Sequence, residues 1–407
     1  MAMRRRWFAF CLGLLGLIAG CQSDPIRCDD ALGCAVVRPG SPIQLVTLLP
    51  TSGETAVWGE ELSRGINLAV SNRGGELLNH NIELIPLNSD CDPEVGLEAM
   101  QTLEDEAPLL GIIGPACSDV VPAILPMVSR NDWLLISPAS TAPSLTTSAP
   151  HPAFFRTVPN HLHQATVAAH FAYEELGVRE TAVLHDNSEF NSVLAQQFRD
   201  TFTQLGGNIV YQGILTLGQS DVAALISETA ENNPELIYLA LFEPEGNLIA
   251  NRLAENNSLN RTSLLGSDSL RTTQFAGQLG NLPAEIYVTG PSLSGTAYDN
   301  FEATWVNRYE TLPTSAAPAY AYDATQLILT AIEEVAVANP NGSLIIGRSE
   351  LRRRLATLNF EGLTGSVRCT QAGDCASATY GVYELDTAVR NNAFWPPPLI
   401  WQFEPQP

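Results

Sequence analysis

The residues best suited to bind a small molecule lie in loops that directly follow predicted β-strands. In an open α/β sheet, ligands bind beyond the carboxyl ends of the strands, so these loops mark where a site would form. The loops are rich in small polar and aromatic residues and contain no recognisable set of nucleophile, histidine and acid. This composition suits noncovalent binding better than catalysis. The six loops cover residues 51–58, 115–119, 138–141, 186–190, 242–246 and 267–270.

Ser118 is a candidate for anion binding because it follows a predicted strand and precedes a predicted helix. Its hydroxyl and the free N–H groups of a helix N-terminus can donate hydrogen bonds to a carboxylate. A serine at this place is also a common helix N-cap, so position alone favours both roles equally.

Two runs of alternating strands and helices would position these loops. The first run has strands at 43–49, 82–87, 109–114 and 133–137, and helices at 61–70, 93–104 and from residue 118. The second run has strands at 181–185, 208–211, 236–240 and 263–266, and helices at 193–205, 222–230 and 248–254. Such alternation is typical of doubly wound parallel sheets, so we expect an α/β fold with two similar lobes.

The first 20 residues have the pattern of a signal peptide. Three arginines precede an apolar segment at 7–19, which is too short to span a bilayer comfortably. The segment ends in Leu17-Ile18-Ala19-Gly20-Cys21, which resembles a bacterial lipobox, so we expect Cys21 to become the first mature residue and to carry lipid. Ordinary cleavage near Gly20 is the alternative. Residues 21–42 would form a tether to the membrane surface, because their prolines and glycines discourage regular structure.

Cysteine usage also indicates export. The sequence has eight cysteines, and six remain if Cys11 leaves with the signal peptide and Cys21 is lipidated. Six cysteines can pair in many ways, and a metal site is the rival interpretation. The six are scattered along the chain without a CxxC pair, which favours disulfides over a metal site. The spacing favours Cys28 with Cys34, Cys91 with Cys117, and Cys369 with Cys375.

The overall charge limits the possible partners. The chain of 407 residues has 44 acidic residues against 21 Lys and Arg, for a net charge of −23. This acidity argues against nucleic-acid binding. A hydrophobic content of 45% with 16% charged residues is typical of a globular protein with a large core.

Five stretches carry a family resemblance: Asp90–Pro93, Gly114–Ser118, Ile136–Thr146, Ala319–Ala324 and Phe360–Val367. In this order and at these separations, they resemble the leucine/isoleucine/valine-binding protein family of type I periplasmic binding proteins. The resemblance runs from about residue 43 to residue 385. It implies two lobes that close on a ligand about a hinge.

The resemblance also implies where the lobes begin and end. Three crossovers are expected, near 158–159, 290–291 and 363–364. Lobe 1 would then consist of 43–158 and 291–363, and lobe 2 of 159–290 and 364–407.

Four positions match polar ligand contacts of the family. Ser118 matches a serine that binds the ligand carboxylate. Ala139 matches a position whose carbonyl accepts from the ammonium, and Thr141 a threonine that contacts both groups. Asp268 matches the acidic residue that pairs with the ammonium, where the family often has glutamate. The shorter aspartate requires the ligand to sit closer or a water to intervene. The alternatives are a polar turn at 139–141 and a surface turn at Asp268.

Three aromatic residues match the wall of the family's site: Trp58, Phe190 and Phe242. Two of these positions are commonly tyrosine in the family, so the resemblance implies a more apolar wall here. Core packing is the alternative for each ring, although all three lie in loops after strands.

Together these observations predict an extracytoplasmic lipoprotein that is not an enzyme. It would capture a small solute, an amino acid with a branched or otherwise apolar side chain, and deliver it to an ABC permease. No metal and no cofactor are expected. The alternative is a ligand sensor or envelope regulatory lipoprotein of the same fold, which binds an amide or another small molecule without transport, because fold does not fix function.

Overall fold

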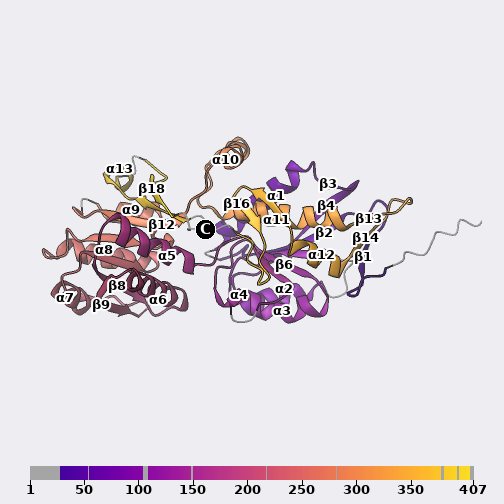
Figure 1. Cartoon of the computed structure of the whole chain (residues 1–407). Coiled ribbons are helices and arrows are strands. Elements are labelled where there is room, and N and C mark those ends of the chain that lie inside the picture. Colours follow the sequence, from indigo (N-terminus) through magenta and orange to yellow (C-terminus); the bar gives the residue numbers. More distant parts are fainter. Residues whose placement is uncertain are drawn as a thin grey trace, which may run out of the picture.

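The computed structural model describes residues 28–53, 55–103, 109–147, 150–216, 218–280, 282–376, 380–391 and 394–403. Within them the chain forms two large sheets flanked by helices, and each sheet with its helices makes one lobe (Figure 1). The predicted class, two doubly wound α/β lobes joined by three crossovers, is confirmed.

The sheet of the first lobe has six strands in the order β3-β4-β2-β5-β6-β7. Neighbours run parallel except β3 and β4, which pair antiparallel. The strands are β2 (Ile43–Leu49), β3 (Glu76–Leu77), β4 (His80–Asn88), β5 (Gly111–Ile113), β6 (Leu134–Ser137) and β7 (Phe154–Arg156). The helices are α1 (Ala56–Asn72), α2 (Pro93–Gln101), α3 (Val120–Arg130), α4 (Ser144–Thr147), α11 (Ala317–Val335) and α12 (Arg348–Leu355).

The strand β2 is apolar at every position except Gln44 and Thr47, and its two covered faces explain why. Leu45 and Leu49 belong to a core that also contains residues of α1, α11 and α12. Val46 and Leu48 belong to a second core with residues of α2 and α3. Successive side chains of a strand point to opposite faces, so helices on both faces require apolar residues at nearly every position.

The sheet of the second lobe has seven strands in the order β18-β17-β12-β11-β10-β8-β9. Its parallel part is extended by β17 and β18, which pair antiparallel. The strands are β8 (Glu180–Asp186), β9 (Asn208–Leu215), β10 (Leu236–Ala240), β11 (Ser263–Gly266), β12 (Ile286–Pro291), β17 (Tyr380–Glu384) and β18 (Leu399–Gln402).

Helices also cover both faces of this second sheet. One core contains residues of α5 (Leu162–His170) and α6 (Glu189–Gln204). The core on the other face contains residues of α7 (Ala223–Glu231), α8 (Glu243–Glu255) and α9 (Thr273–Gln278). The short elements are the π-helix η1 (Phe171–Glu175), the 3₁₀-helix η2 (Asp268–Leu270) and α13 (Thr387–Arg390).

Three segments connect the two sheets. The chain crosses after β7, which ends at Arg156, and crosses back after β12, which ends at Pro291. It crosses for the third time between Cys375, which is buried in a core of the first lobe, and Tyr380, which begins β17 of the second sheet.

The third crossing lies later than the predicted position at 363–364. β15 (Asn359–Gly362) and β16 (Gly365–Arg368) form an antiparallel hairpin. Its Val367 is fully buried in a core of the first lobe, together with both cysteines of the Cys369–Cys375 disulfide. Residues 364–375 therefore pack with the first lobe, because an apolar side chain and a disulfide fix them there.

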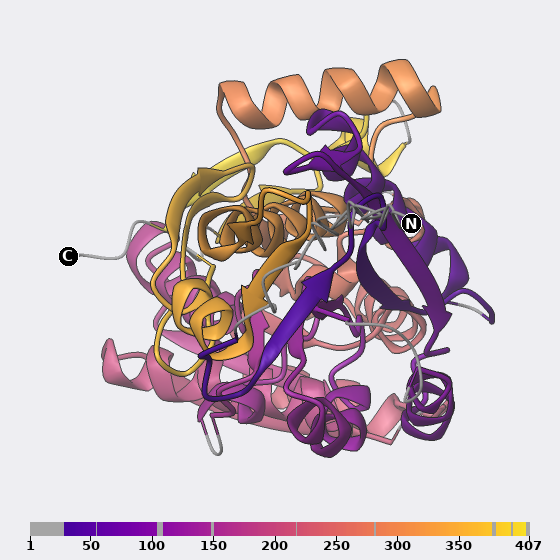
Figure 2. The same cartoon turned by 90° about the vertical axis from the view of Figure 1, so that its right-hand side faces the viewer.

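Helix α10 (Thr296–Tyr309) lies outside both sheets, along the top of the molecule in Figure 2. Its Phe301 and Trp305 are buried against Leu68 of α1 and Ala319 of α11. The loop between α10 and α11 is thereby held near the junction of the lobes.

The N-terminal segment differs from the predicted tether. Cys34–Val37 forms β1, which pairs antiparallel with β14 (Leu344–Gly347), and β14 pairs with β13 (Val337–Ala338). Ala35 and Val37 are buried in a core of the first lobe. The prolines and glycines of this region flank the strand instead of preventing it. The signal peptide at 1–20 and the lipidation site Cys21 lie outside the described residues.

The structure contains the three predicted disulfides, Cys28–Cys34, Cys91–Cys117 and Cys369–Cys375. In the described part of the chain, no helix combines the length and apolar character needed to cross a membrane.

Candidate ligand-binding cleft

A cavity of about 610 Å³ lies between the two lobes. Four of the predicted site residues line it: Trp58, Ala139 and Thr141 from the first lobe and Asp268 from the second. The loop after α10 adds residues 312–316, and Val158 and Pro291 line the cavity beside two of the crossings. The cavity therefore has walls from both lobes, as a hinged binding site requires.

The loop that carries Ala139 and Thr141 begins where β6 ends. Ser137, the last residue of β6, donates through its hydroxyl to the carbonyl of Pro115 at 2.6 Å. The Ser137 hydroxyl oxygen also accepts a hydrogen bond from the backbone N–H of Ser140 at 2.8 Å. These contacts tie the loop to the neighbouring loop after β5, so the two loops hold one shape.

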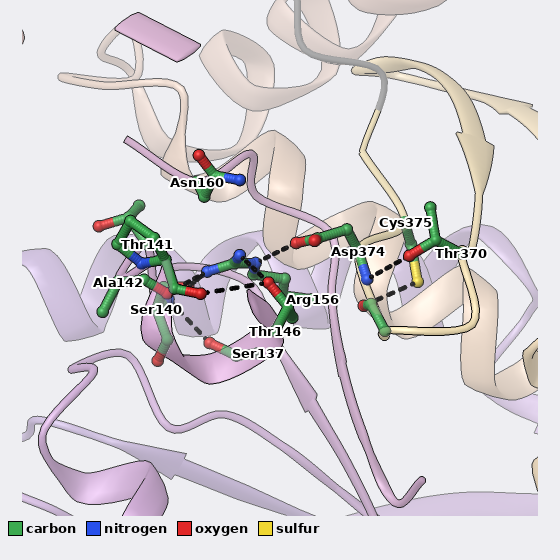
Figure 3. A network of polar contacts seen from close by, with 12 residues as sticks. Ser137, Ser140, Thr141, Ala142, Thr146, Arg156, Asn160, Thr370, Asp374 and Cys375 are labelled. Carbon is green, nitrogen blue, oxygen red and sulfur yellow. Dashed lines mark hydrogen bonds and ion pairs between the residues drawn. The ribbon is translucent and has the colours of Figure 1, made fainter. Parts of the chain in front are cut away.

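Arg156 holds the same loop in place and lies between it and Asp374 (Figure 3). Its side chain is fully buried and donates to the carbonyls of Ser140 at 3.2 Å and Ala142 at 2.7 Å. It also donates to the Thr146 hydroxyl at 2.6 Å and pairs with the Asp374 carboxylate at 2.5 Å. Sequence analysis missed Arg156, because a single arginine at the end of a strand carries no recognisable signal. One buried cation thus connects the binding loop to the Cys369–Cys375 hairpin.

Ser118 does not line the cavity. Its hydroxyl accepts from the backbone N–H of Ala142 at 3.1 Å, across the two loops. It is not the helix N-cap either, because α3 begins at Val120 and Asp119 holds the capping position. A hydroxyl that accepts one hydrogen bond still has its own proton to donate.

His161 connects Thr141 to the second lobe. Its backbone N–H donates to the Thr141 carbonyl at 3.2 Å, and its Nδ1 lies 3.4 Å from the Thr141 hydroxyl. Its ring packs edge-on against Phe190, with centroids 4.5 Å apart. Burial, and secondarily the charge of Arg156, lowers the pKa of His161 to about 4, so the ring is neutral near pH 7.

Asp268 stands at the first residue of η2, directly after β11 and Ser267. Burial raises the pKa of Asp268, while the positive charge of Arg271 and a hydrogen bond from Gln164 act in the opposite direction. A half-buried carboxylate at a cavity wall gains most from a cation that enters the cavity, because the cation restores the interactions lost to burial.

The predicted aromatic wall is divided. Trp58 lines the cavity, whereas Phe190 and Phe242 do not. These two phenylalanines stack on each other with centroids 5.8 Å apart, at the starts of α6 and α8. Phe242 is 37% exposed. The two rings therefore form a stacked pair on the second lobe that does not line the cavity.

Other aromatic residues complete the lining. Tyr320 of α11 and Tyr380 of β17 reach the cavity, and so does Trp395. Burial raises the pKa of both tyrosines, so their hydroxyls stay protonated and can donate to a ligand. The two tyrosines lie within regular elements, so a search of loops after strands could not find them.

The chain also matches known proteins. A sequence model of the periplasmic binding protein family matches residues 42–390. A Leu/Ile/Val-binding protein of Rhizobium johnstonii is 23% identical over 351 residues, which cover 84% of this chain and 92% of that protein.

Solved structures share the fold. A branched-chain amino acid transporter substrate-binding protein from Streptococcus pneumoniae, in complex with isoleucine, has a TM-score of 0.69 at 20% identity, over 84% of this chain and 96% of that one. A solute-binding protein of an ABC transporter from R. palustris, in complex with benzoate, has a TM-score of 0.68 at 20% identity, over 85% of this chain and 94% of that one. Because the family model spans nearly the whole chain from β2 to α13, the protein belongs to the periplasmic binding protein family.

Proposed function

We propose that this protein captures an amino acid with a branched or otherwise apolar side chain and delivers it to an ABC permease. One observation carries the proposal: a cavity between the lobes is lined by the Asp268 carboxylate on one side and by Ala139 and Thr141 on the other. A zwitterion needs a negative charge and acceptors for its ammonium, and donors for its carboxylate, and these residues supply them.

The proposed mechanism begins on the first lobe, where the ligand head group meets the Ala139 carbonyl and the Thr141 hydroxyl. Asp268 then approaches the ammonium as the second lobe closes. Contacts made by both lobes favour the closed form, because a ligand shifts the equilibrium only by its differential affinity for the two forms. The apolar side chain would lie against Trp58 and Val158, which line the same cavity.

Relatives support the ligand class. The Rhizobium protein is named for leucine, isoleucine and valine, and the Streptococcus protein was crystallised with isoleucine. Benzoate in the R. palustris structure makes aromatic carboxylates the second candidate class. The two classes differ in the ammonium group, so the role of Asp268 separates them.

The location we propose is a membrane surface outside the cytoplasm. The family is periplasmic, and the lipobox-like sequence before Cys21 would add a lipid anchor. Replacing Cys21 by serine is expected to release the protein from membranes in a detergent-free fractionation. Retention of that variant in the membrane fraction would contradict the anchor.

The experiment that tests the ligand is thermal unfolding of the full chain against the twenty amino acids, benzoate and simple amides. A ligand at 100 times its dissociation constant adds about 2.7 kcal/mol to the free energy of unfolding, which gives a clear rise in melting temperature. A rise with a group of apolar amino acids supports the proposal. A rise with benzoate alone would favour an aromatic carboxylate, and a rise with amides alone would favour the sensor.

A further inference from the structure

Arg271 lines the same cavity as Asp268, three residues further along the chain. Its backbone N–H donates to the Asp268 carbonyl at 2.9 Å, which closes the 3₁₀ turn of η2. Side chains three residues apart in such a turn lie on the same side. An acidic and a basic side chain from the second lobe therefore stand next to each other at one cavity wall.

An aromatic ring supports the guanidinium group of Arg271. It lies 4.6 Å from the centroid of the Tyr383 ring, whose hydroxyl donates to the Pro291 carbonyl at 2.7 Å. Gly290 leaves space for it, because a Cβ there would stand 2.8 Å from the Arg271 Nε. The neighbouring strands β12 and β17 thus position the group.

The Arg271 guanidinium acts on the Asp268 carboxylate electrostatically, but at more than salt-bridge distance. Among the residues that the structure describes, no Asp or Glu forms an ion pair with it, Asp268 included. A closed cavity excludes water, so a guanidinium left without an acceptor there would cost free energy. An acceptor that arrives with the ligand would compensate this cost.

We propose that Arg271 binds the carboxylate of the ligand, beside the ammonium held by Asp268. The planar guanidinium offers parallel N–H donors that match the two oxygens of a carboxylate. The ammonium and carboxylate of an α-amino acid are attached to one carbon, so adjacent opposite charges on the protein complement them. This assignment rests on the proposed function, and it gives the second lobe a contact to each charged group of the ligand.

The assignment predicts different behaviour for ligands that lack one charge. A carboxylate without an ammonium keeps the contact to Arg271 but meets the negative charge of Asp268. An amine without a carboxylate keeps the contact to Asp268 but meets the positive charge of Arg271.

The test uses leucine and its two deletion analogues, 3-methylbutylamine and 4-methylpentanoate, titrated calorimetrically into the full chain, with competition against leucine for weak binding. Arg271→Gln is expected to lower the affinity for leucine and for 4-methylpentanoate by about 10- to 100-fold, and not to lower the affinity for the amine, because the variant removes a like charge. Arg271→Lys keeps the charge but loses the parallel N–H donors. Its affinities for leucine and 4-methylpentanoate are expected to lie between those of Arg271→Gln and the wild type.

Arg179→Gln is the matched control, since Arg179 also stacks on a tyrosine, 3.9 Å from the centroid of the Tyr173 ring, but does not line the cavity. It should leave all three affinities unchanged. If Arg271→Gln lowers the affinity for all three ligands equally, or for none of them, Arg271 does not bind the carboxylate and the inference is wrong. The proposed function itself is contradicted if the wild type binds none of the three and no other apolar amino acid raises its melting temperature.

Discussion

Asp268 and His161 are the two titratable residues whose behaviour bears most directly on the site. Asp268 lines the cavity, and burial raises its pKa. His161 lies behind Thr141 as a neutral ring, because burial lowers its pKa. Each shift has a consequence that a single substitution can isolate.

Replacing Asp268 by asparagine should weaken amino acid binding about tenfold or more, which corresponds to about 1.4 kcal/mol. In the wild type, affinity should fall as the pH falls through the raised pKa of Asp268, because a protonated acid cannot pair with an ammonium. The asparagine variant should lack this dependence. Calorimetric titration between pH 4 and pH 8 measures both effects.

Asp299→Asn is the control, because Asp299 lines a neighbouring cavity that does not include Asp268. It should bind as the wild type does. An unchanged affinity in the Asp268 variant would remove this residue from the site.

His161 should make stability depend on pH. The pKa falls from 6.5 to about 4 on folding, so between these values the unfolded chain binds a proton that the native chain does not. Stability is therefore lost as the pH falls through this window, by up to about 1.4 kcal/mol per pH unit. His161→Gln should lose less stability than the wild type between pH 7 and pH 4.5, as measured by urea unfolding.

The pH profile of the wild type must be compared with that of the His161 variant, because Asp323 changes the free energy of unfolding with pH in the opposite direction. Burial raises the pKa of Asp323 to about 6, so its contribution to stability decreases as the pH rises towards that value. Parallel pH profiles for the wild type and the His161 variant would show that this histidine does not titrate as described.

At the scale of elements, the binding loop depends on a buried arginine. Arg156 at the end of β7 joins the loop after β6 to the hairpin closed by Cys369 and Cys375. The loop positions Ala139 and Thr141, although neither residue contacts Arg156 through its side chain. One side chain thus holds both the hairpin and the loop that we propose to bind the ligand.

Asp374→Asn should destabilise the protein by about 3–5 kcal/mol, because it leaves the buried Arg156 charge without its carboxylate. The control is Glu255→Gln, which breaks an exposed ion pair with Arg252 and should cost about 1 kcal/mol or less. Urea unfolding measures both. Equal, small losses would mean that the Arg156 contact contributes little.

At the scale of the whole molecule, the first lobe includes chain from both ends of the sequence. The strand β1 completes a small sheet with β14, more than 300 residues later, and buries Ala35 and Val37. Long-range pairing of this kind ties the N-terminal segment to the fold and shortens any tether that precedes it.

A chain that begins at residue 41 should therefore be less stable than one that begins at residue 28, by about 2–4 kcal/mol for the two lost apolar side chains. A chain from residue 28 with Cys28→Ser and Cys34→Ser keeps β1 and separates the strand from the disulfide. Equal melting temperatures for the chains from 28 and 41 would contradict a structural role for β1.

The local pattern of apolar residues was sufficient to predict strands of the parallel sheets. Apolar runs at 43–49 and 236–240 predict buried strands, and the structure has β2 and β10 at these positions, because both faces are covered. The short strand β1 escaped prediction, because its sequence resembles its surroundings and its partner lies far along the chain.

The sequence by itself determined the family, the two α/β lobes, the three disulfides and four residues that line the cavity. Periodicity predicted the lobes and spacing predicted the disulfides, whereas the family and the four cavity residues were implied by the resemblance of ordered motifs to a known family. The tertiary structure decided the third crossing, the inward position of Tyr320 and Tyr380, and the support of the binding loop by Arg156. It also decided that Arg271 stands beside Asp268 without an ion pair. Each of these depends on contacts between segments distant in the chain, which no local pattern encodes.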